Sequence, residues 1–597
     1  MRKLLFIALL CFPFTLQAVS TYDDFYGNSG TDGGALEADG VGNALGGAPP
    51  DPPDPPLAAS DSWNCLVNIN GWTPETNRCV DLTSETGPTL GGTAIDCDGF
   101  DGVNPNASKE YIFRDTVTEA ELENTSYDRF YVCNTVTAAN VQNINRDCTS
   151  ETGGYCLIQN WNTNTFDSEL HPANQQDTQR SRFTNLEFDE TADNWRIKGI
   201  TIDGGDNSTD GISVNGADDL VIHMVYFDTQ PGGIEPSGSA VECVGPSTGL
   251  HIQYSQFDGW ATQNATYTNL DTENIRLNNN CDNVSIWMNV IKDGGDNILV
   301  ATDGAAEAVE DLYIDSNELY FDVNLASCDD GANEPADADD ECLCGENNLD
   351  LEGGGISGSN GTIRRNIIHM GRPQASEIGG VGNEFDCGGT GDLNGALVNM
   401  HFNYGHVAFY ANILMDFSAG IIAGNDGDAG LPGQADIAKN VFYDWDKYYS
   451  AAASNRRSVA LVLNELDDSR VTQNTFIPVS TSIEYCIDFS NDSDIEGNLF
   501  WQDCLFTGST TGSVKNNIFA NGLTDTIGDT AEHELTVTAN NITFYKNYIL
   551  GGVNASGSTR CASCVNHRGD TFTLPIDTGL QLGGLVTLTD DAAKGPQ

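Results

Sequence analysis

The segment Ile286-Trp287-Met288-Asn289-Val290-Ile291 decides the fold, because its pattern of apolar-x-x-Asn-x-apolar recurs along much of the chain. Eight further copies of the pattern surround Asn317, Asn366, Asn412, Asn440, Asn474, Asn498, Asn517 and Asn547. Three earlier copies keep the apolar frame without asparagine and centre on Ile200, Val225 and Ser255. Successive copies are 19 to 49 residues apart, a spacing typical of repeat architectures.

Each part of the repeat has a physical role. Asparagine tolerates the left-handed backbone that a sharp bend between strands needs, and its amide can bond to the asparagines of the neighbouring copies. The flanking apolar side chains point inward and stack, since a single coil cannot bury its own apolar face. The sequence therefore predicts an all-β solenoid of about 12 coils over residues 191–550, roughly 55 Å long at about 4.8 Å per coil.

One such copy per coil resembles the right-handed parallel β-helix of the pectate-lyase-like superfamily. The resemblance covers about 350 residues and implies the fold. It leaves the function open, because this fold hosts lyases, hydrolases, epimerases, adhesins and structural proteins. In addition, the segment from Phe572 to Gly579 resembles a phrase that often closes secreted β-helix proteins.

The composition divides the rest of the chain. Residues 1–18 resemble a secretory signal peptide, with Arg2 and Lys3 before an apolar stretch and Ala18 at its end. Removal of this peptide leaves 16 cysteines, and an even number in an exported chain favours disulfides. The expected order is signal peptide 1–18, Gly/Asp/Pro-rich linker 19–60, disulfide-rich N-terminal cap 61–190, β-helix 191–550 and C-terminal capping tail 551–597.

The charge of the chain limits its partners. With 26 basic and 87 acidic residues the formal net charge is −61, which repels nucleic acid. The same charge disfavours polyanionic substrates unless a cation bridges them. It indicates either simple solubility or calcium binding. No segment after the signal peptide is long and apolar enough to cross a membrane, so we expect a secreted or cell-surface protein.

The two longest intervals in the repeat both border the coil at Ile363, so their loops are candidates for function. The first of these loops carries a cluster of carboxylates, at Asp329, Asp330, Asp337, Asp339, Asp340 and Glu341. Carboxylate oxygens are the ligands that Ca²⁺ takes in proteins. The cluster therefore predicts either a Ca²⁺ site or a solvated acidic loop.

The coil at Ile363 also concentrates basic residues, at Arg364, Arg365, His369 and Arg372. Polysaccharide lyases of this fold resemble one another in pairing calcium with a Lys or Arg base, so the resemblance implies a catalytic role for these residues. The alternative is that they pair with surrounding acids.

Three aromatic residues, Trp287, Tyr410 and Tyr545, stand two positions before a ladder asparagine. They are candidates for sugar stacking or, alternatively, for packing.

Two short segments, one ending in Asp210-Gly211 and one containing Asp296-Asn297, resemble carboxylate motifs of polygalacturonases. The second has Asn297 where that family has an acid. The Arg196-Ile197-Lys198 segment also comes before both motifs, whereas the family places it last. The sequence therefore does not predict a polygalacturonase site.

Two functions remain open at this point. In the first, the protein binds an extracellular polysaccharide, and whether it also cleaves the polysaccharide as a lyase is left open. In the second, it is a non-catalytic cell-surface or matrix component that associates with other copies of itself. The sequence does not decide whether the protein is an enzyme.

Overall fold

The structure, a computed structural model, describes residues 102–566 with the exception of 104–110, 115–116, 133–138, 152, 161–180, 204–209, 229–237, 259–272, 293, 302–308, 322–346, 353–359, 371–395, 401–405, 418, 424–433, 446–458, 464–468, 478–483, 490–492, 502–503, 509–511, 516, 521–522, 525–531, 538–541, 546–547, 550–551, 556–559 and 563–564. The signal peptide, the linker and most of the tail that the sequence predicts lie outside these residues. No described helix is long and apolar enough to cross a membrane.

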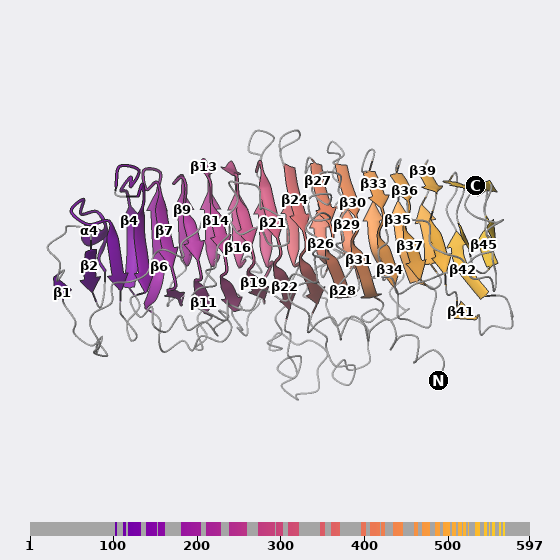
Figure 1. Cartoon of the computed structure of the whole chain (residues 1–597), viewed down its shortest axis with the longest axis horizontal. Helices are drawn as coiled ribbons and strands as arrows, with labels where there is room; N and C mark the ends of the chain where they lie inside the picture. The colour runs from indigo at the N-terminus through magenta and orange to yellow at the C-terminus, as the bar shows by residue number, and fades with distance from the viewer. Residues whose placement is uncertain are drawn as a thin grey trace, which may run out of the picture.

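The described chain is a right-handed parallel β-helix, which confirms the predicted fold. Figure 1 shows its strands stacked along one axis, from the N-terminal end in indigo to the C-terminal end in yellow. Each coil contributes one strand to a 17-stranded sheet and then, after a bend, strands to two rows of a 28-stranded sheet. Neighbouring coils pair in parallel; antiparallel pairing occurs only between β1 and β2 and between β41 and β42 among the described strands.

The 17-stranded sheet consists of β1 (Gly102–Val103), β2 (Tyr111–Arg114), β3 (Arg129–Val132), β5 (Cys156–Asn160), β7 (Trp195–Lys198), β10 (Val221–His223), β14 (His251–Gln253), β18 (Ser285–Trp287), β21 (Leu312–Asp315), β24 (Asn360–Arg364), β27 (His406–Tyr410), β30 (Gln434–Ala438), β33 (Ser469–Thr472), β36 (Ser493–Glu496), β39 (Gly512–Lys515), β43 (Ile542–Tyr545) and β46 (Arg560–Ala562).

The first row of the 28-stranded sheet follows the bend and consists of β8 (Thr201–Ile202), β11 (Tyr226–Asp228), β15 (Gln256–Asp258), β19 (Val290–Lys292), β22 (Glu318–Phe321), β25 (Ile367–Met370), β28 (Ile413–Phe417), β31 (Val441–Trp445), β34 (Thr475–Ile477), β37 (Leu499–Trp501), β40 (Ile518–Ala520), β44 (Tyr548–Ile549) and β47 (Val565–Asn566). The long strand β6 (Arg182–Asp189) pairs with strands of both rows.

The second row consists of β4 (Ala139–Ile144), β9 (Ile212–Asn215), β12 (Val241–Val244), β16 (Ile275–Asn278), β20 (Ile298–Ala301), β23 (Leu349–Glu352), β26 (Ala396–Met400), β29 (Ala419–Ala423), β32 (Val459–Leu463), β35 (Glu484–Phe489), β38 (Cys504–Gly508), β42 (Glu532–Val537) and β45 (Gly552–Ala555), with β41 (Leu523–Thr524) beside β42. Two short strands, β13 (Ser247–Thr248) and β17 (Cys281–Asp282), form a sheet of their own.

The predicted asparagine ladder is present at the bend between the two sheets. The amide Nδ2 of Asn289 donates to Oδ1 of Asn317 at 3.0 Å, and the backbone N–H of Asn289 donates to the same oxygen at 2.9 Å. The same two bonds link each following pair through Asn366, Asn412, Asn440, Asn474, Asn498 and Asn517. The side chain of Asn547 lies outside the described residues.

The bend itself differs from the prediction in one respect. The left-handed residue is not the ladder asparagine but the residue before it, for example Met288 at φ 55°, Arg365 at φ 56° and Lys439 at φ 61°. This conformation costs a non-glycine residue about 1–2 kcal/mol of free energy. The buried amide bonds of the next residue offset that cost, so the ladder and the bend depend on each other.

Inward side chains form the core because the coils are in register. Ile252, Ile286, Ile314 and Ile363 are successive partners in the 17-stranded sheet, and all four are buried. In the 28-stranded sheet, Phe476 lies between two stacked phenylalanines from adjacent coils, with ring centroids 4.8 and 4.7 Å away. Similar apolar side chains therefore stack at the same position of successive coils, and this stacking buries each coil against the next.

The parallel stack is longer than the range 191–550 indicated by the asparagine motif. It begins at β2, inside the region expected to be a cap, and continues to β46 and β47. Among the residues of 61–190 that the structure describes, the disulfide Cys148–Cys156 closes the loop before β5. The first copy used to set that range centres on Ile200, so the strands before it were not expected to belong to the stack.

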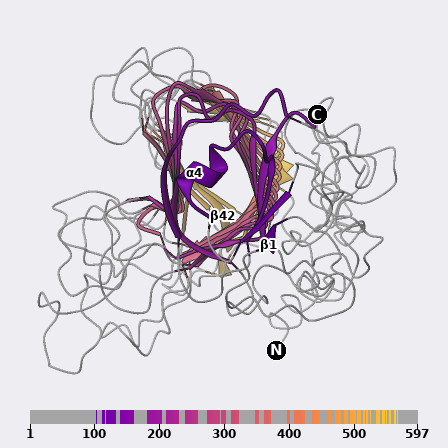
Figure 2. The same cartoon turned by 90° about the vertical axis from the view of Figure 1, so that its left-hand side faces the viewer.

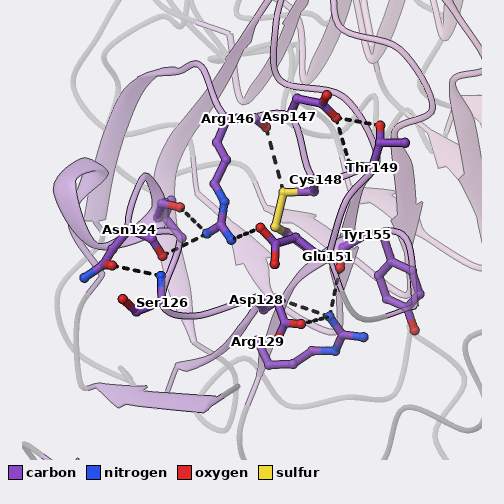
Figure 3. Close-up of polar contacts among 12 residues, drawn as sticks. Asn124, Ser126, Asp128, Arg129, Arg146, Asp147, Cys148, Thr149, Glu151 and Tyr155 are labelled. Carbon is purple, nitrogen blue, oxygen red and sulfur yellow. Dashed lines mark hydrogen bonds and ion pairs between the residues drawn. A yellow bond between two sulfur atoms is a disulfide. The ribbon is translucent and has the colours of Figure 1, made fainter. Parts of the chain in front are cut away.

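The short helix α4 (Glu119–Leu122) lies across the N-terminal end of the stack in the end-on view of Figure 2. Leu122 is fully buried there. The guanidinium of Arg146 donates to the carbonyls of Leu122 and Asn124 at 3.0 and 3.1 Å, and its other nitrogen donates to Glu151 at 2.7 Å (Figure 3). A cation at carbonyls that follow a helix is favourable, so Arg146 ties α4 to the first coils.

Candidate active site: a carboxylate face

Polar side chains gather on the outer face of β9, β12, β16, β20 and β23, in the second row of the 28-stranded sheet. Alternate residues of these strands point to the core, so the residues between them point outward. We call six of these residues the carboxylate face: Asp210, Glu242, Glu273, Arg276, Asp296 and Asp350. Because neighbouring coils are about 4.8 Å apart, side chains on adjacent strands are within reach of one another.

The centre of the carboxylate face is a pair of carboxyl groups, Asp210 and Glu242. Asp210 lies two residues before the start of β9, and Glu242 points outward from β12, which pairs with β9 in parallel. The two carboxyls share a hydrogen bond, and the backbone N–H of Ser239 donates to Oδ1 of Asp210 at 2.8 Å. Burial, the hydrogen bond to Glu242 and the charge of Glu242 together raise the pKa of Asp210 to about 8. Asp210 therefore carries a proton at neutral pH and can donate it.

Next to this pair lies the one arginine of the face. Arg276 points outward from β16, and its Nε is 3.9 Å from Oε1 of Glu242. Its Nη1 is 3.5 Å from Glu273, whose side chain is only 3% exposed. The Ser239 hydroxyl donates to the other oxygen of Glu273 at 2.8 Å. The arginine charge is therefore shared between two carboxylates.

A second asparagine ladder places the acids that precede the strands. Asn274 Nδ2 donates to Asn297 Oδ1 at 2.8 Å, and Asn297 Nδ2 donates to Asn348 Oδ1 at 2.6 Å. Gly294 permits this turn, because a Cβ there would lie 2.8 Å from Asn274 Nδ2. Asn297, the residue that made the Asp296-Asn297 motif depart from polygalacturonases, is thus a structural residue.

The sequence did not predict this site as a whole. It singled out Asp210 and Asp296 as parts of motifs, but it did not indicate Glu242, Glu273 or Arg276. A detectable signal does exist, since Glu273-Asn274-Ile275 and Asp296-Asn297-Ile298 repeat the order acid, Asn, apolar at the start of successive strands.

The basic residues predicted to be catalytic do not form one group. Arg364 Nε donates to Asp315 Oδ2 at 3.2 Å. Arg365 donates to both oxygens of Asp315, one of them at 2.8 Å. Asp315 is fully buried and Arg365 is 6% exposed. These contacts match the alternative reading of the two arginines, pairing with acids.

The two remaining members of that prediction lie elsewhere. His369 is on β25, 3.3 Å from Glu318, and its ring stacks on Tyr320 with centroids 4.8 Å apart. Arg372 lies outside the described residues. The described part of the structure therefore brings Arg364 and Arg365 together, and His369 is held by different partners on another strand.

The three aromatic residues that the sequence offered for sugar stacking differ in how far their side chains are buried. Trp287 is 2% exposed and packs edge-to-face on Tyr254 at 5.0 Å. The burial of Trp287 matches the packing alternative. Tyr410 is partly buried, and burial together with the nearby charge of Asp436 raises its phenol pKa. The side chain of Tyr545 is not described.

The predicted Ca²⁺ ligands, from Asp329 to Glu341, lie outside the described residues. Among the residues that are described, no group of three or more His, Cys, Asp or Glu side chains is placed to hold a metal ion. The Ca²⁺ site therefore stays a prediction.

Comparison with known proteins finds only distant structural neighbours. No protein-family model matches the sequence, and no curated protein matches it significantly. Among solved structures, a thermostable GH87 α-1,3-glucanase from Streptomyces thermodiastaticus is 11% identical, over 78% of this chain and 70% of that chain, with a TM-score of 0.35. PfbA, a surface adhesin of Streptococcus pneumoniae, is 11% identical over 73% of this chain and 82% of its own, with a TM-score of 0.31. A family 28 exopolygalacturonase of Yersinia enterocolitica is 12% identical over 77% and 62%, with a TM-score of 0.27.

Proposed function

We propose that the protein binds an uncharged extracellular polysaccharide on the carboxylate face and cleaves its glycosidic bonds with Asp210 as the general acid and Glu242 as the nucleophile. The observation that carries the proposal is the hydrogen-bonded pair, in which one carboxyl keeps its proton at neutral pH beside a second carboxylate. Two carboxyls in different protonation states are what glycoside cleavage requires.

In this mechanism Asp210 gives its proton to the leaving oxygen, and Glu242 attacks the sugar carbon as the nucleophile. The glycosidic oxygen takes the place of Glu242 as the partner of the Asp210 proton. This step leaves the sugar bound to Glu242 as an ester. Water then cleaves the ester, with the Asp210 carboxylate taking the proton of the water, so we expect the product to keep the anomeric configuration of the substrate.

The charge of the site supports an uncharged substrate. The carboxylate face holds five carboxyl groups and one arginine, and that arginine is already shared by Glu242 and Glu273. A uronate would face repulsion from these acids. The net charge of −61 of the whole chain also repels a negatively charged polysaccharide, over longer distances.

An extracellular location is part of the proposal. It rests on the predicted signal peptide at residues 1–18 and is compatible with two disulfides in the described chain, Cys148–Cys156 and Cys243–Cys281. Disulfides persist in oxidising compartments.

The test is an assay of the oxidised mature protein on a panel of neutral and uronate polysaccharides. It follows new reducing ends and unsaturated-uronate absorbance, with calcium and with chelator. We expect new reducing ends from a neutral glycan, lost by about 100-fold or more in Asp210→Asn and Glu242→Gln. The matched control is Asp436→Asn, which removes a carboxylate on the other sheet and should leave cleavage unchanged.

Other outcomes redirect the proposal. Calcium-dependent absorbance lost in Arg365→Ala would support the lyase predicted from the sequence instead. A folded wild-type protein that is silent on every glycan would contradict cleavage and favour the non-catalytic surface or matrix role, which electron microscopy of assemblies would then examine.

A further inference from the structure

We propose that Asn215 and Asn278 bind hydroxyl groups of an extended neutral polysaccharide that lies along the axis of the β-helix, with one sugar at each asparagine and one between them. The inference deepens the proposed function, because it names the class of polysaccharide and its direction across the outer face of the second row. It rests on the proposed function only for cleavage, and its binding test does not need turnover.

The two asparagines lie two coils apart on the same outer face. Asn215 is the partner of Val244 where β9 pairs with β12. Asn278 holds the same position on the other edge of β12, because Arg276, two residues earlier, is the partner of Glu242. Neighbouring strands are about 4.8 Å apart, so the two positions are separated by about 9.6 Å along the axis.

The amide of Asn215 is held at both ends. Its Nδ2 donates to Glu187 Oε1 on the preceding strand β6 at 3.1 Å, and its Oδ1 accepts from the Ser213 hydroxyl on β9 at 3.1 Å. A side-chain amide has two N–H groups and two lone pairs. Beyond its bonds to described residues, Asn215 therefore keeps one N–H and one lone pair, and its side chain is partly exposed.

Asn278 repeats this arrangement. Its Nδ2 donates to Glu242 Oε1 on the preceding strand β12 at 2.9 Å, and its Oδ1 accepts from Arg276 Nε on β16 at 3.1 Å. The two amides therefore share one bonding pattern and offer the same remaining groups. A sugar hydroxyl can both donate and accept a hydrogen bond, as each amide requires. Because the amides are held in place before a ligand arrives, binding has to order few side chains.

The exposure of neighbouring residues indicates where the glycan lies. In the register row that contains Arg276, the residues toward the N-terminal end, Ser213 and Glu187, are partly exposed. The next two members toward the C-terminal end, Leu299 and Asp350, are only 7% and 3% exposed. The accessible part of the row therefore extends from β16 across β12 and β9 to β6.

The spacing of the amides selects the class of polysaccharide. In a straight β-1,4-linked glucan or mannan each sugar is turned over relative to the one before it, so every second sugar presents the same hydroxyls to a surface. The separation of about 9.6 Å between the two asparagine positions is close to the length of two such sugars. A coiled α-1,4-linked chain curves away from a straight row and does not meet both amides in this way.

The test is the binding of cellohexaose and mannohexaose, with the coiled maltohexaose for comparison, measured by titration calorimetry. The Asp210→Asn protein is used, so that the glycans stay uncleaved. In that background Asn215→Ala should weaken binding of the extended chain by about 10-fold. The matched control is Asn124→Ala, which removes an exposed asparagine at the N-terminal end of the stack and should leave binding unchanged. If Asn215→Ala does not fold, Ser213→Ala removes one bond that holds the amide and should weaken binding by about threefold.

The outcomes separate this inference from the proposed cleavage. Unchanged affinity in a folded Asn215→Ala would overturn the inference even if the wild type cleaves a glycan. Maltohexaose bound as tightly as the extended chains, or no binding of either extended chain, would overturn it as well. Conversely, the expected loss of affinity in a protein whose wild type releases no reducing ends would uphold the inference and contradict the proposed cleavage.

Discussion

Replacement of Asp210 by asparagine should make the protein more stable at neutral pH and, at the same time, inactive. Asparagine keeps the shape of the side chain, and its carbonyl oxygen can still accept from the Ser239 N–H. Its amide can donate to Glu242, as the protonated Asp210 carboxyl does. The variant therefore preserves the hydrogen bonds and removes only the ability to ionise.

The magnitude follows from the raised pKa of Asp210. The pKa is about 8 in the folded protein and about 3.9 in an unfolded chain. The folded state therefore binds the proton more tightly, and stability falls as the pH rises from about 4 to about 8. At pH 7 the wild type has lost at most about 4 kcal/mol of stability in this way, because pH 7 lies about three pH units above the pKa in the unfolded chain. Asp210 is partly exposed and shares its proton with Glu242, so we expect about 1–2 kcal/mol.

The assay is denaturant unfolding of wild type and variant at pH 4, 7 and 8, with reducing-end release measured in parallel. Asp210→Asn should match the wild type at pH 4, exceed it at pH 7 and 8, and lose cleavage. Asp436→Asn is the control of opposite sign. Its hydrogen bond to His406 and its contacts with Arg470 lower the pKa of Asp436, so that variant should lose stability above about pH 4. Equal stability of Asp210→Asn and wild type at pH 8 would refute the reasoning about the pair.

Three further substitutions test the scaffold by unfolding experiments. Asn412→Ala removes four buried hydrogen bonds of the first ladder and should cost about 3–5 kcal/mol; a loss below about 1 kcal/mol would mean that the ladder does not stabilise the stack. Arg365→Met leaves the buried Asp315 with a weaker counter-charge and should cost about 3 kcal/mol, most of it regained when Asp315→Asn is added. Joint replacement of Cys243 and Cys281 by alanine opens a loop with a sequence separation of 38 and should cost about 4 kcal/mol, and an unchanged unfolding midpoint would contradict this.

Much of the fold could be predicted because it depends on local pattern. The apolar residues around Asn289 and its counterparts repeat as one local pattern, and all coils run in the same direction with the same register. The periodicity of the sequence alone therefore indicates coils that stack through this asparagine. The early coils from β2 to β5 lie before residue 191, where the range indicated by the twelve copies of the pattern begins. The role of the residue before the asparagine was also missed, since no residue type is common to Met288, Arg365 and Lys439.

The site was harder to predict, because it depends on which outward residues become neighbours. Asp210, Glu242 and Arg276 lie 32 and 34 residues apart in successive coils of unequal length, and sequence spacing does not align such coils.

The chain sequence alone determines the stacked coils, the first ladder and the acidic surface, because each depends on residue type and repetition. Only the tertiary structure decides that Asp210 meets Glu242, that Asp315 binds both Arg364 and Arg365, and that Trp287 is buried. Each of these outcomes depends on the register between neighbouring strands, which sets what every outward side chain touches.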